Sequence, residues 1–273
     1  MRKEYTTKLF RVTYTLEEEG PHLTIPYDHY NDVYVIAVFF QGGGVCNMEG
    51  TPHALEPGTI MVLPSEDIRC FRFRQNGCHE RISLYFTGSI LSGLADAMPV
   101  WSLFAPHSQK RYTPEHYDPN TVQPLLEKLR ELLLREDPLK EAKIHLLILE
   151  LMFALFDAGQ VDERSVQNEQ IGEICRYIRS HLTQELSYES LQERFLVSRY
   201  QLTEVFRRST GMPLTEYIIH KRLTEAASRI REGMPIEQAA EQAGFCTYSH
   251  FYKAFKKRYG VSPRQYSKNT LGK

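Results

Sequence analysis

The chain has 273 residues, of which 42% are hydrophobic, 25% charged and 11% aromatic, and its formal net charge is −1. This composition is typical of globular proteins and excludes collagen-like, low-complexity and wholly disordered chains. Because domains commonly have about 100–200 residues, the length predicts two of them.

The charge is divided unevenly along the chain. Residues 1–165 contain 16 basic and 23 acidic residues, a net −7, whereas residues 166–273 contain 17 basic and 11 acidic residues, a net +6. Two ordinary domains could differ in this way by chance. The alternative is that the basic part meets an anionic polymer or surface while the acidic part has another task.

The sequence predicts a cytoplasmic protein without a membrane anchor. Its first 20 residues contain no apolar run of the kind that a secretory signal needs. The most apolar stretch, residues 145–158, includes Glu150 and is shorter than the about 20 residues that cross a bilayer. The five cysteines are scattered without C-x-x-C spacing, so we expect reduced thiols and neither a disulfide framework nor a zinc site.

A strand pattern covers residues 9–90. Runs rich in β-branched and aromatic residues occur at 33–40, 59–63 and 81–86, and turns containing glycine or proline separate them. Many short strands at this spacing predict a sandwich or a small barrel.

A pair of helices is predicted over residues 120–157. Apolar residues recur at helical intervals from Val122, and a second helix follows Pro138. The run LLILELMFALF in this second helix is apolar on nearly every side, so it must be covered on more than one face. A partner subunit or full burial within one chain would provide the second cover. The polar residues 159–169 that follow are expected to be a linker between two domains.

The C-terminal part contains an internal repeat with an offset of 49 residues. It aligns Phe206 with Phe255, Gly211 with Gly260 and Tyr217 with Tyr266. The repeated unit therefore begins with a large apolar residue, Leu202 or Phe251, and continues after three further residues as F-basic-x-x-x-G-x-x-x-x-x-Y. Two copies of one helical module are predicted.

Each copy has the pattern of a helix-turn-helix. In the second copy, Ala240 allows two helices to approach closely and Gly244 can adopt the left-handed backbone of a tight turn. Thr247 or Ser249 would then begin the second helix of that copy. In the first copy, Ser198 is a strong N-cap for the corresponding helix.

The outward faces of these two second helices carry long donors, hydroxyls and amides, which are suited to base edges and phosphates in a major groove. A solvated helix face is the alternative for any single basic residue. Two aligned faces in a domain of net charge +6 favour DNA. The residues expected to contact DNA are Ser198, Arg199, Tyr200, Gln201, Thr203, Arg207, Thr247, Tyr248, His250, Tyr252, Lys253 and Lys256.

Residues 171–269 resemble the tandem helix-turn-helix domain of AraC/XylS-type transcription regulators. The strongest signature is in the second copy, where P-I-x-x-A-A-x-x-x-G-F at 235–245 precedes F-x-x-x-F-K-x-x-x-G-V-S-P-x-x-Y at 251–266. The resemblance implies that a helix over 215–231 joins two modules and presents them to successive major grooves, about 34 Å apart. A helix of this length spans about 26 Å.

Three residues depart from the family pattern. Gln192 stands where a small residue is usual, Ser267 stands where a basic residue usually follows the final tyrosine, and Glu204 stands where the aligned Lys253 is basic. Glu204 would either accept from a cytosine amino group or repel phosphate. The first module is therefore expected to contact DNA differently from the second.

The strand region resembles the small cupin-like barrel that precedes such DNA-binding domains, on the pattern L-x-P-G-x-I-x-x-L-P at 55–64. Cupin enzymes hold a metal with an H-x-H pair, a glutamate and a later histidine, and this chain lacks that set, so we expect neither a metal, nor a cofactor, nor catalytic residues. A binding pocket for a small effector is expected instead. Its candidate residues are His29, Tyr34, Met61, Arg69, Arg72 and Tyr85.

The expected fold class is a multidomain α+β chain. Residues 1–158 would bind the effector and dimerise, with a barrel at about 9–90 and helices at about 120–157. After the linker at 159–169, residues 170–273 would bind DNA, with helix-turn-helix modules at about 186–211 and 236–260. The expected function is a bacterial transcription regulator whose partners are double-stranded DNA, a small effector, a second copy through residues 120–157 and RNA polymerase. The alternative is a metal-dependent cupin-type enzyme fused to a DNA-binding domain.

Overall fold

The computed structural model describes residues 1–17, 24–25, 33–74, 77–91, 99–105, 111–159 and 169–271. They form two compact units. The first contains Met1–Cys46, His53–Asp67 and Phe71–Ser165, and the second contains Asn47–Pro52, Ile68–Cys70 and Val166–Lys273. Of the features predicted from sequence, residues 160–168 of the linker and the candidate His29 lie outside the described residues.

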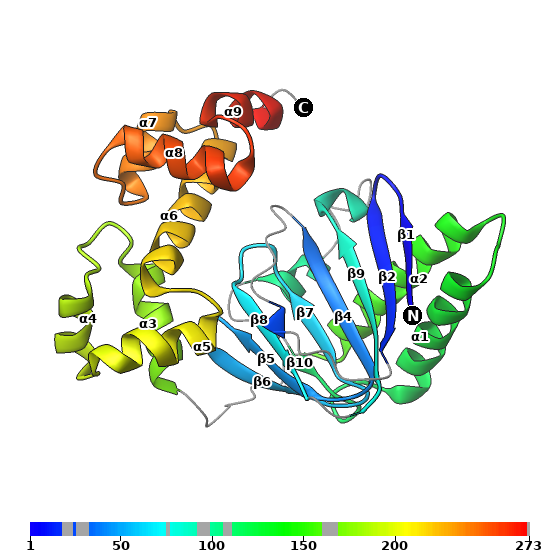
Figure 1. The fold of residues 1–273 in the computed structure, drawn as a ribbon. Helices are drawn as coiled ribbons and strands as arrows, with labels where there is room; N and C mark the ends of the chain where they lie inside the picture. Colours follow the sequence, from blue (N-terminus) through cyan, green and yellow to red (C-terminus); the bar gives the residue numbers. More distant parts are fainter. Residues whose placement is uncertain are drawn as a thin grey trace. The chain divides into compact units, whose positions relative to one another are not determined.

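The first unit is built on a six-stranded sheet with the strand order β1-β2-β9-β4-β7-β10 (Figure 1). The neighbours are antiparallel, and the alternation of side chains along β4 gives the sheet two different faces. The strands are β1 (Arg2–Thr6), β2 (Phe10–Glu17), β4 (Tyr34–Gln41), β7 (Ile60–Leu63), β9 (His79–Phe86) and β10 (Arg111–Tyr112).

A second sheet has the order β3-β8-β5-β6. Its strands are β3 (Thr24–Ile25), β8 (Arg69–Phe73), β5 (Gly44–Met48) and β6 (Thr51–Leu55). The rings of Phe71 and Phe73 on β8 lie 6.2 and 6.3 Å from the ring of Phe39 on β4, so β8 packs against one face of the larger sheet there. The described strands thus form two sheets, not one closed barrel.

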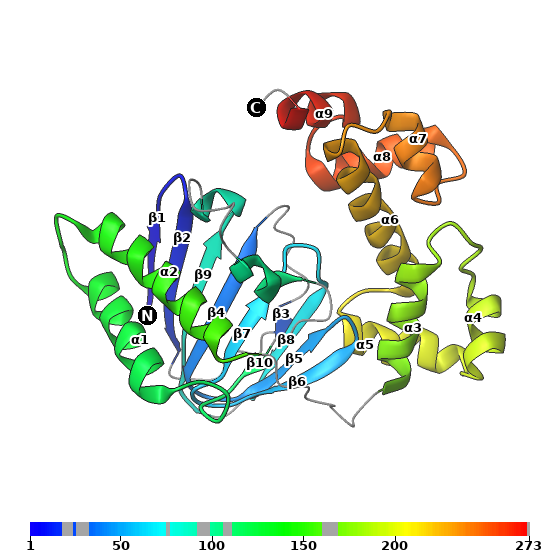
Figure 2. The same cartoon turned by 180° about the vertical axis from the view of Figure 1, so that it is seen from behind.

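Two helices cover the opposite face of the larger sheet, as Figure 2 shows. They are α1 (Pro119–Leu134), which begins at the N-cap Asp118, and α2 (Lys140–Asp157). Ile36 and Val38 point to this face and share one buried cluster with Leu126 and Ile148. The short helices η1 (Gly88–Leu91) and η3 (Pro99–Phe104) add to the same cluster. No helix in the described ranges is long and apolar enough to cross a membrane.

The second unit is helical apart from its two short segments, and this confirms an α+β chain with a sheet-rich first part and a helical last part. Its elements are α3 (Glu169–Ser180), α4 (Tyr188–Phe195), η4 (Gln201–Val205), α5 (Phe206–Thr210), α6 (Leu214–Arg231), α7 (Ile236–Gln242), α8 (Tyr248–Tyr259) and α9 (Pro263–Leu271). We call α4 with η4 and α5 the first helical pair, and α7 with α8 the second helical pair.

Both helical pairs pack against α6. In the first, the ring of Phe206 lies 5.3 Å from the ring of Tyr217 on α6, edge to face. In the second, Phe251 and Phe255 are fully buried in one cluster with Ile230 of α6. The apolar residues of the sequence repeat therefore form the packing of the two pairs.

The first helical pair differs from the expected single helix after Ser198. Residues Gln201–Val205 form a π-helical turn, in which the N–H of Phe206 bonds to the carbonyl of Gln201. The Thr203 hydroxyl donates to the Arg199 carbonyl at 3.0 Å and so competes with the ordinary backbone bond. The turn before it has Leu196 at φ 52°, a left-handed conformation.

Gly244 makes the tight turn of the second helical pair at φ +91°, as the sequence predicts. A β-carbon there would collide with the carbonyl oxygen of Leu182. Gly233 has the same φ of +91°, but its added β-carbon would meet nothing within 4 Å. The two glycines therefore share a backbone conformation and differ in the space around them.

We expect Gly233→Ala to lower the free energy of unfolding by about 1–2 kcal/mol, the cost of a left-handed alanine. Gly244→Ala adds a collision with backbone and should cost about 4 kcal/mol or more. Urea unfolding followed by circular dichroism would measure both. Equal losses for the two variants would contradict the close approach of Leu182.

Candidate nucleic-acid interface

Helix α8 is anchored at its start and along its buried face. The Thr247 side chain accepts from the His250 N–H at 3.4 Å, which satisfies one of the open donors of the first turn. Phe251 and Phe255 hold the opposite side of the helix in the core. The exposed face is therefore presented in a fixed orientation.

All six candidates of the second copy are exposed on this helix or at its N-cap. The set consists of Thr247, Tyr248, His250, Tyr252, Lys253 and Lys256. Tyr248 packs between Phe251 and Tyr252, and the His250 ring meets the edge of Phe245, so these aromatic side chains are supported by neighbours.

Positive charge collects in the last turns of α8. Lys256, Lys257 and Arg258 follow one another there. Lys256 and Lys257 are exposed, whereas Arg258 is half-buried and donates to the Thr224 hydroxyl at 3.2 Å. Two of these three cations thus reach solvent, and one fixes α8 to α6.

In the first helical pair, several candidates are engaged within the protein. Arg199 forms an ion pair with Glu189 at 2.8 Å, and its guanidinium lies over the Tyr188 ring at 4.4 Å. Gln201 accepts from the Ser198 N–H at 2.7 Å, and the Ser198 hydroxyl accepts from the Gln201 N–H at 3.2 Å. The contacts of Ser198 and Gln201 stabilise the start of η4, and those of Arg199 connect this start to α4.

The remaining candidates of the first pair differ in exposure. Tyr200 and Arg207 are exposed, whereas Thr203 is half-buried and bonded to backbone. The departures from the family pattern, Gln192, Glu204 and Ser267, are all half-buried. The first pair therefore offers fewer unengaged donors than α8 does.

The candidates in the first unit are divided between the two faces of the sheet. Tyr34 lies with Trp101 and Phe104 on the side of the helices, at ring distances of 5.0 and 4.9 Å. Met61 and Tyr85 share the other face, because Ala37 pairs with Met61 and Val35 pairs with Tyr85. Tyr34 is thereby separated from these two.

On β8, side chains alternate between the two faces of the strand. Arg69 lies on the same face as Phe71 and Phe73, and Arg72 lies on the other face. Sequence reasoning missed Arg11, whose guanidinium lies 4.3 Å from the centre of the Tyr85 ring. The two residues are directly paired between β2 and β9. Only the register of two strands more than 70 positions apart shows this contact, so no local sequence signal could reveal it.

The described ranges contain no group of three or more histidine, cysteine, aspartate or glutamate side chains that could hold a metal ion. The cysteines Cys46, Cys70 and Cys175 are buried as free thiols, and Cys246 is exposed. Burial raises the pKa of the Cys175 thiol to about 12, and the nearby Glu49 carboxylate adds to this, which keeps the thiol protonated.

Comparisons with known proteins agree with the helical geometry. A family model described as a helix-turn-helix domain matches residues 191–269. The HTH-type transcriptional activator RhaS of Klebsiella pneumoniae (strain 342) is 22% identical over 271 residues, which cover 95% of each chain. The probable transcriptional regulator LumQ of Photobacterium leiognathi is 32% identical over 106 residues, which cover 38% of this chain and 43% of LumQ.

Among solved structures, the fatty-acid-bound ToxT from Vibrio cholerae strain SCE256 aligns with a TM-score of 0.41 and 16% identity, covering 98% of both chains. The match of the helix-turn-helix domain and the similarity to transcriptional activators along nearly the whole chain show that the protein is a DNA-binding transcription regulator, similar to those of the AraC/XylS type.

Proposed function

We propose that the two helical pairs are two helix-turn-helix modules and that α8 reads base edges in a major groove. The observation that carries this proposal is the exposed face of α8, where a hydroxyl cap, two tyrosines, a histidine and two lysines are held by a buried aromatic stripe. Residues of these types supply the donors and acceptors for base readout. The module boundaries are those predicted from sequence, about 186–211 and 236–260.

We propose a different task for the first module. Because Arg199 is paired with Glu189, and Gln201 with Ser198, these side chains must give up internal contacts before they can reach bases. Exposed Arg207 and Arg208 remain suited to phosphates, which position a protein on the duplex without reading sequence. The second module then provides most of the discrimination among sites.

Lys253→Ala and His250→Ala should each weaken binding to a DNA site selected by the wild-type protein by about 1–3 kcal/mol, with less loss on random DNA. Lys268→Ala, which removes the same charge from α9, is the matched control and should leave discrimination unchanged. Gel-shift titrations at one fixed salt concentration would measure the ratio of selected to random affinity. Full discrimination in both α8 variants would show that α8 does not read the bases.

We propose that a small effector binds between the two sheets, on the face of the larger sheet opposite α1 and α2. The middle of this face has small side chains, Ala37 and Ser83, while Phe39 and Met61 lie beside them. Arg11 at its margin provides a cation beside an aromatic ring. These features suit an apolar effector with an anionic group.

Arg11→Gln should abolish the thermal stabilisation given by an anionic effector found in a screen of carboxylates, sugars and fatty acids. Arg2→Gln removes the same charge from the exposed strand β1, which makes it the matched control, and should keep the stabilisation. Differential scanning fluorimetry measures both. If no anion in the screen changes the wild-type melting temperature, the hypothesis of an anionic effector is wrong. If Arg11→Gln and Arg2→Gln respond equally, Arg11 does not bind the effector.

We also propose that α2 joins two copies of the chain. Leu139, Leu146 and Phe153 are seven residues apart and are 61%, 60% and 39% exposed. The exposed Ala142 and the half-buried Leu149 and Phe156 follow each of them by three residues. This is the a/d spacing of a coiled-coil seam, in which Leu149 and Phe156 also pack partly against the buried cluster of the first unit. This spacing fits packing against α2 of a second copy of the chain.

Leu146→Glu and Phe153→Glu should raise the dimer dissociation constant by about tenfold or more, because each places a charge in the seam. Glu141→Lys changes charge at an exposed position of α2 outside the seam and should leave it unchanged. Light scattering over a range of protein concentrations is the measurement. A monomeric wild-type protein at micromolar concentration would refute the seam.

The cupin-type enzyme remains less favoured, since the relatives that match along nearly the whole chain are transcriptional activators. As a regulator, the protein would act in the cytoplasm on double-stranded DNA, with RNA polymerase as a further partner.

A further inference from the structure

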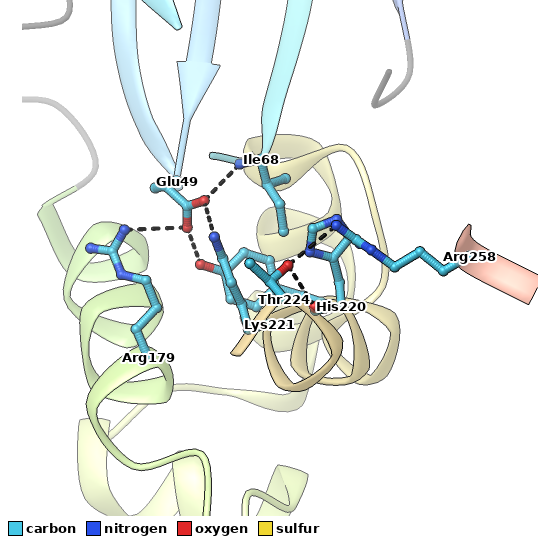
Figure 3. A network of polar contacts seen from close by, with 8 residues as sticks. Glu49, Ile68, Arg179, His220, Lys221, Thr224 and Arg258 are labelled. Atoms are coloured by element: carbon cyan, nitrogen blue, oxygen red, sulfur yellow. Dashed lines mark hydrogen bonds and ion pairs between the residues drawn. The ribbon is translucent and has the colours of Figure 1, made fainter. Parts of the chain in front are cut away.

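A buried carboxylate lies in the second unit, on a turn that comes from the strand region of the sequence (Figure 3). Glu49 belongs to the segment Asn47–Pro52, which connects β5 and β6. Its side chain is 8% exposed, and its backbone has φ 51°, a left-handed conformation that costs free energy in any residue except glycine. A strained and buried acid needs compensating contacts.

Four donors surround this carboxylate. Lys221 on α6 donates to Oε1 at 2.5 Å, and the Ile68 N–H donates to the same oxygen at 2.6 Å. The Tyr217 hydroxyl, also on α6, donates to Oε2. Arg179 on α3 lies 3.5 Å from Oε2. Both oxygens are thus bonded, and two cations and a phenol from two helices converge on them.

The electrostatics of the site favour the charged acid. Burial by itself raises the pKa of Glu49, but Lys221 and Arg179 together with the hydrogen bonds outweigh it, so the pKa lies below its ordinary value. The dependence is mutual, because the Lys221 side chain is only 7% exposed. A buried side chain of this kind requires an oppositely charged partner, and Glu49 is that partner here.

The backbone of the turn also fits closely against α3. A β-carbon at Gly50 would lie 3.0 Å from Ile171 and 3.2 Å from Cys175, and one at Gly172 would lie 3.1 Å from Thr51. Ile68 and Ile174 are fully buried. The turn therefore packs closely against α3 beside the carboxylate.

From these contacts we propose that Arg179, Tyr217 and Lys221 form a carboxylate-binding site whose ligand is Glu49 of the same chain. The first helical pair is held in its DNA-binding arrangement only when a carboxylate occupies this site. The anion does not come from residues 169–271, so the order of these helices depends on the turn between β5 and β6. Movement of β5 or β6 that withdraws Glu49 would empty the site and weaken DNA binding. This control point rests on the proposed DNA-binding function.

The test is chemical rescue of Glu49→Ala in the full chain. The variant keeps a side chain at φ 51° and removes only the acid, so we expect a lower melting temperature and about tenfold weaker binding to the selected DNA. Acetate or propionate should restore both properties, since either can place a carboxylate between Lys221 and Arg179. Acetamide, or chloride at the same ionic strength, should restore neither.

Glu80→Ala is the matched control. Glu80 is also a buried carboxylate, which accepts from the Tyr14 hydroxyl at 2.9 Å and from Arg130 at 3.3 Å, but it lies in the sheet unit. Its loss should lower the melting temperature and leave DNA affinity unchanged at temperatures where the variant is folded. If Glu49→Ala is insoluble, Glu49→Gln keeps the shape of the side chain, and Glu49→Gln with Lys221→Met should be more stable than Glu49→Gln alone.

The proposal is overturned if Glu49→Ala binds DNA as the wild type does, or if acetate and acetamide act alike. It is also overturned if Lys221→Met fails to improve the stability of Glu49→Gln. Failure of the proposed function looks different: the wild-type protein would not discriminate DNA sites, while acetate would still raise the melting temperature of Glu49→Ala.

Discussion

The packing of both helical pairs on one helix, α6, is the constraint on which the account of function depends. In its first half, the ring of Tyr217 contacts the ring of Phe206. In its second half, Ile230 belongs to one buried cluster with Phe251 and Phe255. A helix of 18 residues spans about 27 Å, so it sets the separation of the two pairs without any flexible joint. For comparison, successive major grooves of DNA are about 34 Å apart.

The same helix connects packing with electrostatics. Between these two contacts, α6 carries Lys221, which forms an ion pair with the Glu49 carboxylate, and Thr224, whose hydroxyl accepts a hydrogen bond from Arg258 on α8. Burial, with the charges of Arg258 and Lys221 adding to it, holds the pKa of His220 well below its ordinary value, so the imidazole between these cations stays neutral. Each buried charge near α6 needs a partner. The arrangement of α6 is therefore sensitive to loss of the Glu49 carboxylate, which is the partner of Lys221.

Features set by local chemistry could be predicted from the sequence. The Thr247 cap, the Gly244 turn and the apolar stripe of α8 each depend on a few neighbouring residues and are confirmed. Contacts between distant positions could not be predicted: the pairing of Arg11 with Tyr85, and of Glu49 with Lys221, 172 residues away, depends on sheet register and helix docking. The π-helical turn was missed because it depends on side-chain bonds of Thr203 to backbone that compete with the ordinary helix.

In the proposed function, α6 places two modules in successive major grooves and α8 does most of the base reading. Methylation protection of guanines on the selected DNA site, compared between wild type and Lys253→Ala, tests it most directly. We expect two protected major-groove patches about 10 base pairs apart, of which Lys253→Ala loses one and keeps the other. A single patch in the wild type, or the same protection in both proteins, would contradict it.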